Sequence, residues 1–202
     1  MKSYAIFYDW ESHRVLVGMG GQEPGVVPVV RPAGRHYFPG GSATGKGMTP
    51  KNICTYAALE IAQEVGKNLK VAFDFYKDTA AIHRFQFGLT SVYFVVCYVN
   101  RLVMDCISEQ SYVNSTHGSR FSRIVALSVP AAARSFRDGG PSTSWFVSGL
   151  STLPTLPRIY TLGGANREEI RGQPTPAQMA YADDEAERTL QHWDLFGLPI
   201  IP

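Results

Sequence analysis

The sequence has few cysteines, little net charge and no C-x-x-C pair. The three cysteines are Cys54, Cys97 and Cys106, so no zinc or disulfide framework is indicated, and reduced thiols in a cytoplasmic compartment are expected. The 19 basic and 17 acidic residues leave a formal charge of +2, which gives no long-range field for gathering a polyanion. The charge balance therefore carries no signal of a nucleic-acid partner and does not exclude one.

Long hydrophobic runs are also missing. The longest run, Val92 to Val99, has the length of a strand and falls far short of the roughly 18 residues that suggest a membrane-spanning helix. The N-terminal run from Tyr4 to Tyr8 is broken by Asp9, so it lacks the apolar core of a signal peptide. Neither a membrane nor a leader is expected, and the 202 residues predict one globular domain over 1–202.

Patterns of apolar residues predict a chain of strands with a few helices. The two runs Tyr4–Tyr8 and Arg14–Gly18 flank a polar turn and predict a β-hairpin. Residues 20–47 are rich in Gly and Pro and predict a long loop, with a short strand at Val26–Val30. Further strands are expected at Lys70–Tyr76, Ile82–Phe87, Ser91–Asn100 and Arg123–Val129, further loops at 108–122 and 139–157, and helices at Pro130–Phe136 and Thr175–Phe196.

The clearest helix signal covers Pro50–Val65. Thr49 is a good N-cap, Pro50 fits the first helical position, and Gly66 is placed to end the helix. On a helical wheel, Glu60 lies on the apolar side, and Glu64 follows one turn later at about 6 Å. The other members of that side are Ile53, Tyr56, Ala57 and Ile61.

The glycines before this helix and the acids within it resemble the box of the Nudix hydrolases, G-x5-E-x7-R-E-U-x-E-E-x-G-U, where U is aliphatic. The matching residues are Gly41, Glu60, Ile61, Glu64 and Gly66. The sequence departs from the box where Leu59 replaces Arg, Gln63 replaces the first Glu of the E-E pair, and Lys67 replaces the last aliphatic residue. The loop after Gly41 also lacks the early Glu and is four residues longer.

The order of hairpin, Pro-Gly-Gly loop, helix and further strands is similar to that of the same family over residues 3–136. The resemblance implies an α+β fold with a Nudix-like mixed β-sheet sandwiched between helices. The segment 137–202 adds a loop-rich stretch and a C-terminal helix, which is assigned to the fold by order alone.

The resemblance also implies a function. Nudix-type enzymes cleave a nucleoside diphosphate linked to another moiety, with Mg²⁺ or Mn²⁺ neutralising phosphate oxygens and activating water. Carried over, Glu60 and Glu64 are the expected metal ligands and catalytic residues, and Glu109 is a candidate base. The cations Arg35, Lys46 and Lys51, with the backbone of Gly40 and Gly41, are expected to contact phosphate in a small-molecule substrate.

Other interpretations stay open. Loss of the Arg and of one Glu lowers the expected Mg²⁺ affinity, so the alternative is a Nudix-like protein without pyrophosphohydrolase activity. Such a protein would bind a nucleotide-like ligand or a protein partner, or do other chemistry in the same pocket. The acids could instead pair with Lys67 or a neighbouring Arg on a solvated helix. The stretch from Gly40 to Gly47 also approaches a P-loop, but Gly47 stands where Ser or Thr would bind Mg²⁺.

Overall fold

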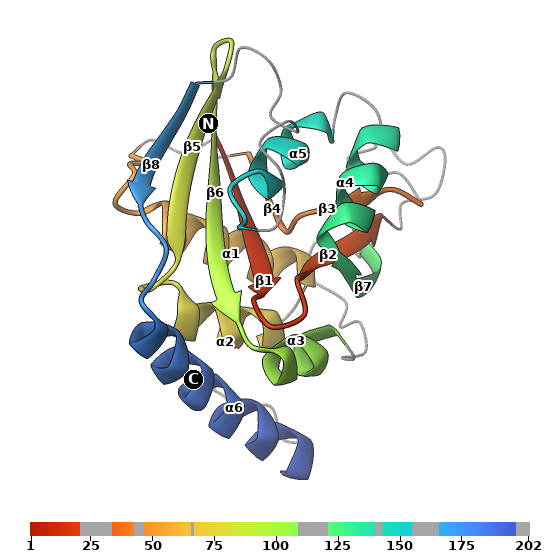
Figure 1. Ribbon diagram of the computed structural model, residues 1–202, viewed down its shortest axis with the longest axis vertical. Coiled ribbons are helices and arrows are strands. Elements are labelled where there is room, and N and C mark those ends of the chain that lie inside the picture. Colours follow the sequence, from red (N-terminus) through yellow and green to blue (C-terminus); the bar gives the residue numbers. More distant parts are fainter. Residues whose placement is uncertain are drawn as a thin grey trace.

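The computed structural model describes residues 1–20, 34–42, 47–65, 67–108, 121–139, 143–154 and 166–196, without the side chains of 63–65, 67, 68 and 191–196. One eight-stranded mixed sheet has helices on both of its faces (Figure 1). The helices are α1 (Ile53–Val65), α2 (Lys67–Tyr76), α3 (Arg101–Ser108), α4 (Val129–Asp138), α5 (Ser144–Leu150) and α6 (Pro176–Phe196).

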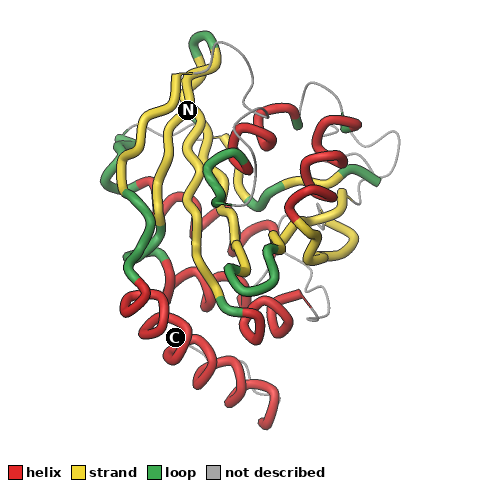
Figure 2. The backbone as a smooth tube through the Cα atoms, in the orientation of Figure 1, coloured by secondary structure: helices red, strands yellow, loops and turns green. Residues whose placement is uncertain are grey.

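The sheet is built around a parallel pair. Strand β1 pairs with β6 in parallel over its whole length, and the strand order is β3-β2-β1-β6-β5-β8, with β4 paired to β1 and β7 paired to β2. Figure 2 shows these strands as the long central layer of the molecule. Their bounds are β1 (Lys2–Asp9), β2 (Arg14–Gly20), β3 (His36–Tyr37), β4 (Gly40–Ser42), β5 (Ala81–Phe87), β6 (Thr90–Val99), β7 (Phe121–Ser128) and β8 (Asn166–Arg171).

Two strands share the edge of β1 that faces away from β6. Strand β2 pairs with β1 only at Tyr8 and Asp9 before it continues along β7. Strand β4 pairs with the opposite end of β1, from Lys2 to Tyr4. Between them, the backbone N–H of Ala5 donates to the carbonyl of Pro39 at 2.9 Å. The Pro-Gly-Gly segment is therefore held along β1 by backbone hydrogen bonds.

Helices cover the two faces of the sheet in pairs. Alternate residues of β1 point to opposite faces, so Phe7 meets Phe73 of α2, with ring centroids 6.3 Å apart, while Tyr4 meets Phe146 of α5 at 4.8 Å. Helix α1 also contacts β1, and α4 contacts α5. The predicted α+β class, with a mixed sheet between helices, is confirmed.

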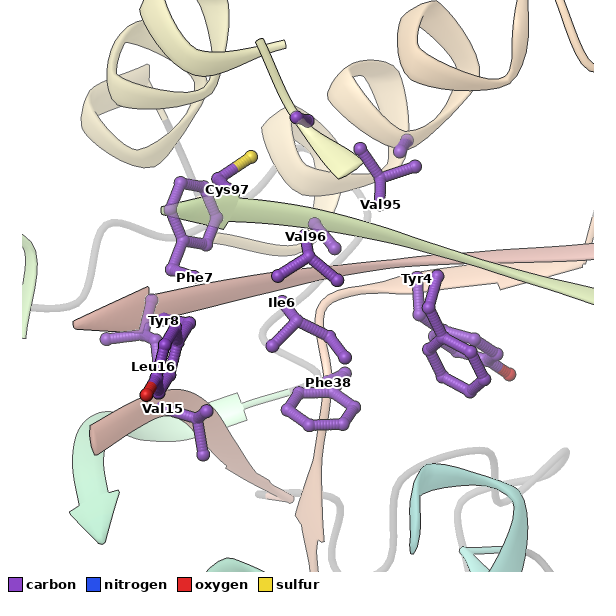
Figure 3. Packing of buried hydrophobic residues seen from close by; sticks show 14 of the residues in the cluster. Tyr4, Ile6, Phe7, Tyr8, Val15, Leu16, Phe38, Val95, Val96 and Cys97 are labelled. Atoms are coloured by element: carbon purple, nitrogen blue, oxygen red, sulfur yellow. The ribbon is translucent and has the colours of Figure 1, made fainter. Parts of the chain in front are cut away.

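The core is continuous through the sheet because β6 is buried on both faces. Figure 3 shows Phe7 and Cys97 on the side of α1 and α2, and Ile6, Val96 and Phe38 on the other side. All five side chains are fully buried. An uninterrupted apolar run is typical of a strand covered on both faces, and the sequence predicted such a strand at Ser91–Asn100.

The predicted helix Pro50–Val65 begins three residues later, at Ile53. The Asn52 side chain closes a turn instead, because its Oδ1 accepts from the backbone N–H of Thr49 at 2.6 Å and its Nδ2 donates to the carbonyl of Gly47 at 2.8 Å. The N–H of Tyr56 then donates to the Asn52 carbonyl at 3.1 Å. Thr49 and Pro50 therefore lie in this turn, outside the helix.

The strand predicted at Lys70–Tyr76 is wrong, because these residues belong to helix α2. Its buried residues recur at helical spacing, namely Leu69, Ala72, Phe73 and Tyr76.

Of the other predicted elements, some are confirmed and some lie outside the described residues, and several observed elements were not predicted. The hairpin is confirmed, as are the strands at Ile82–Phe87 and Arg123–Val129 and the helices at Pro130–Phe136 and Thr175–Phe196. Helix α3 and strand β8 were not predicted. Strands β3 and β4 lie in the segment 20–47, and α5 lies in the segment 139–157, both of which were expected as loop. Val26–Val30 and most of the loop 108–122 lie outside the described residues. Along the described chain, no helix combines the length and the apolar character needed to cross a bilayer.

Candidate functional site

The Pro-Gly-Gly turn leaves no room for a side chain at its first glycine. Gly40 has φ +139°, and a Cβ built on it would lie 2.2 Å from the carbonyl oxygen of Ser3 and 2.7 Å from the Cα of Tyr4. Both of these are backbone atoms of β1, which cannot move without breaking the sheet. Glycine is thus required at this position by the close approach of β4 to β1.

The second glycine touches the acid that the sequence singled out. A Cβ built on Gly41 would lie 2.9 Å from Oε2 and 3.4 Å from Cδ of Glu60. Glu60 is half-buried on the third turn of α1, and its carboxylate rests against the backbone of β4. Gly41 is therefore small because a carboxylate occupies the space in which its side chain would stand.

The other carboxylate oxygen of Glu60 has a partner on the same helix. The Tyr56 hydroxyl donates to Glu60 Oε1 at 2.9 Å, as the i, i+4 spacing permits. The same hydroxyl contacts the carbonyl oxygen of Ser42, at the end of β4. Tyr56 was predicted only as part of the apolar side of this helix, although its spacing from Glu60 was the available signal for the hydrogen bond.

A buried hydroxyl lies on the same side of the sheet. Ser3 is paired directly with Gly41, and opposed residues of an antiparallel pair project to one face, which here is the face of Glu60. Ser3 is fully buried, and within the described part of the chain its Oγ has no hydrogen-bond partner. The junction of β4 and α1 thus combines a carboxylate, a phenol and an unsatisfied hydroxyl.

Three of the predicted site residues come together at this junction, namely Gly40, Gly41 and Glu60. Arg35 precedes β3, which pairs with β2 and not with β1, and its side chain is exposed. Lys51 is exposed in the turn before α1, and Glu60 lies about 10 Å further along the helix axis than the start of α1. Both cations thus lie on the surface, and their contact with phosphate stays a prediction.

The remaining predicted residues lie wholly or partly outside the described part of the chain. Glu64 falls in the last turn of α1, one turn beyond Glu60, but its side chain lies outside the described part of the chain. Lys46 and Glu109 also lie outside the described residues. Among the residues that are described, no three His, Cys, Asp or Glu side chains form a group able to hold a metal ion.

Leu59 occupies the position where the Nudix box has Arg. Its side chain is 53% exposed, next in sequence to the carboxylate that the Arg would help to orient. A leucine cannot donate a hydrogen bond, so any orientation of Glu60 comes from other groups. In the described structure that group is Tyr56.

The thiols form no site of their own. Cys54, Cys97 and Cys106 form no disulfide with one another. Burial raises the pKa of the Cys54 thiol despite a hydrogen bond from Arg171 at 3.1 Å, and it raises the pKa of the fully buried Cys97 well above its usual range. A raised pKa keeps a thiol protonated and unreactive, so neither residue is a nucleophile candidate.

No protein-family model matches the chain, and no curated protein sequence matches it. Among solved structures, the chain is similar to an Ap4A hydrolase from C. elegans, with 13% identity, a TM-score of 0.41, and coverage of 76% of this chain and 100% of that one. It is also similar to the E. coli dihydroneopterin triphosphate pyrophosphohydrolase, with 16% identity, a TM-score of 0.37, and coverage of 66% and 84%.

The E. coli ORF135 protein is a third such structure, with 11% identity, a TM-score of 0.37, and coverage of 77% of this chain and 93% of that chain. With TM-scores below 0.5, these likenesses carry no argument of their own. The resemblance to the Nudix hydrolases therefore rests on two features of this chain. Gly41 and Glu60 lie next to each other, and the hairpin, glycine turn, helix and sheet follow in the same order.

Proposed function

We propose that the protein is a divergent Nudix-like hydrolase that uses a divalent cation to cleave a nucleoside diphosphate linked to another moiety. The observation that carries this proposal is the position of the Glu60 carboxylate, which occupies the space where a side chain of Gly41 would stand. It joins the glycine turn and the helical acid, the two parts of the box that the sequence retains, at one point of the fold.

Carboxylates of α1 are the proposed ligands of Mg²⁺ or Mn²⁺. Mg²⁺ keeps several waters and is commonly bound by one or two carboxylates together with substrate phosphates. Glu60, with Glu64 one turn later on the same helix, would provide these carboxylates. A bound cation would neutralise phosphate oxygens and lower the pKa of a water, while Glu109 remains a candidate base by resemblance alone.

The substrate contacts follow from the phosphate chemistry. The exposed cations Lys51 and Arg35, and Lys46 between them in sequence, are proposed to meet phosphate groups as they approach the glycine turn. The expected partner is therefore a phosphate-containing small molecule. Cysteines that form no disulfide favour a reducing compartment such as the cytoplasm for this activity.

A second candidate function is ligand binding without hydrolysis. It is favoured by Leu59, exposed where an Arg would orient the carboxylates, and by Gln63, which removes one negative charge from the helix. Such a protein would bind a nucleotide-like ligand or a protein partner, or do other chemistry in the same pocket.

Restoring the two missing groups separates these candidates. In the double variant Leu59→Arg/Gln63→Glu, the hydrolase proposal predicts tighter Mn²⁺ binding and faster release of phosphate or pyrophosphate from nucleoside diphosphate-linked compounds, because the cation gains a ligand and an orienting group. Thermal unfolding with Mg²⁺, with each compound, and with both together measures binding separately. The binding function would be favoured if a compound stabilised the protein equally with and without Mg²⁺ and neither protein hydrolysed it.

A further inference from the structure

We propose that Tyr56 is a positioning residue for the cation site, holding the Glu60 carboxylate against Gly41 and linking it to strand β4. The inference rests on the proposed function, since it concerns how the chain prepares Glu60 for a divalent cation. It assigns to the phenol the orienting task that Leu59 cannot perform.

The geometry of Glu60 supports this role. Its Oε1 accepts the hydrogen bond from Tyr56 at 2.9 Å, while its Oε2 faces Gly41. The hydrogen bond comes from α1, and the neighbouring backbone belongs to β4, so two different elements confine the carboxylate. If Glu60 lacked these neighbours, its side chain would become ordered only when the cation binds. The entropy cost of that ordering would lower the affinity of the site for the cation.

The second contact of the phenol connects the two elements. The Tyr56 hydroxyl also reaches the carbonyl oxygen of Ser42, and it carries a single proton. The hydroxyl can thus donate to Glu60 or to Ser42, but not to both at once. Donation to Glu60 uses one of the two lone pairs of Oε1 and leaves the other for a cation, so the hydroxyl can hold the carboxylate both before and after the cation binds.

The test is the dissociation constant of Mn²⁺, measured by electron paramagnetic resonance without substrate. The variant Tyr56→Phe keeps the ring and removes the hydroxyl, and we expect it to weaken Mn²⁺ binding by about 10- to 100-fold, as loss of partners behind metal ligands does. The matched control is Tyr181→Phe, on the exposed face of α6, which should bind Mn²⁺ as the wild type does. Thermal unfolding of each variant confirms that it folds.

Glu60→Gln separates the inference from the proposed function. If Tyr56 acts through Glu60, removing the hydroxyl should have no further effect on Mn²⁺ binding in the Glu60→Gln background. An unchanged affinity in Tyr56→Phe, alongside a loss in Glu60→Gln, would overturn the inference and leave the proposed function standing. Equal losses from Tyr56→Phe in both backgrounds would also overturn it. If the wild type binds no Mn²⁺, or if Glu60→Gln binds it normally, the proposed metal site itself fails.

Discussion

Gly40 and Gly41 are adjacent residues that lack side chains for different reasons. Gly40 faces the backbone of β1 and has a positive φ, whereas Gly41 faces the end of one flexible side chain, Glu60. A backbone clash cannot be relieved locally, but a glutamate can rotate away. The first glycine therefore serves the fold and the second serves the position of the carboxylate.

Alanine substitutions should separate these two roles. Gly40→Ala is expected to destabilise the protein by about 2 kcal/mol or more, since it combines backbone strain with a clash. Gly41→Ala is expected to cost less than about 1 kcal/mol, because only the Glu60 side chain must move, yet to weaken Mn²⁺ binding as the carboxylate leaves its place. Urea unfolding and Mn²⁺ titration of both variants measure the two effects.

The opposite pattern would contradict this division of roles between the two glycines. If Gly41→Ala kept the Mn²⁺ affinity of the wild type, the contact between Gly41 and Glu60 would have no part in metal binding. Each variant is the control for the other, because both add one methyl group to the same turn.

At the scale of elements, the pairing of β8 with β5 contains a buried histidine. His83 on β5 is 3% exposed, and its Nδ1 lies 3.3 Å from a guanidinium nitrogen of Arg167 on β8. Arginine can only donate, so Nδ1 accepts and the ring is neutral. Burial, with a smaller contribution from Arg167, lowers the pKa of His83 to about 4.

This pKa predicts a pH-dependent stability. Because the folded pKa lies below the unfolded value of about 6.5, the unfolded state takes up the proton first as the pH falls. The stabilisation is complete above pH 6.5 and is lost progressively between pH 6.5 and 4. The variant His83→Gln, which cannot titrate, should lack this part of the slope. Urea midpoints of the two proteins from pH 7.5 to 4 measure the difference, and parallel curves would show that folding does not lower the pKa of His83.

Some elements could be predicted because their sequence pattern is compatible with only one type of secondary structure. The long β-branched run of β6 fits a strand buried on both faces, and Pro130 opening a short apolar segment fits helix α4. The C-terminal helix was signalled in the same way by Pro176 near its start.

Other elements could not be predicted correctly because local signals competed. In α2, aromatic and β-branched residues between Lys70 and Tyr76 favoured a strand, although the spacing of Leu69 and Phe73 was helical. Strand β8 is mostly exposed and charged, and its pairing with β5 is a long-range event that no local pattern encodes.

The candidate site shows the same division. Gly41 and Glu60 could be proposed from a motif with fixed spacing, and the fold brings them into contact. The contributions of Tyr56, Ser42 and Ser3 depend on how β4 and β1 pack against α1, because each needs a partner from another element. Tertiary contacts of this kind are absent from a helical wheel.

At the scale of the whole molecule, two polar clusters lie toward opposite ends of β1. Strand β4 pairs with the Lys2 end, whereas helix α6 crosses the other end of the sheet (Figure 1). There, buried Asp183 accepts from the Tyr76 hydroxyl at 2.6 Å and from the N–H of Asn100 at 3.0 Å. Burial raises the pKa of Asp183. These hydrogen bonds hold α6 against the sheet. The proposed metal site lies at the opposite end of β1, beside β4.

The most direct test of the central claim is the rate of phosphate or pyrophosphate release from a panel of nucleoside diphosphate-linked compounds, with and without Mg²⁺, in the wild type and in Glu60→Gln. We expect at least one compound to release product at a rate that depends on Mg²⁺ and that falls about 100-fold or more in the variant. Full activity in Glu60→Gln, or activity that is indifferent to Mg²⁺, would contradict it.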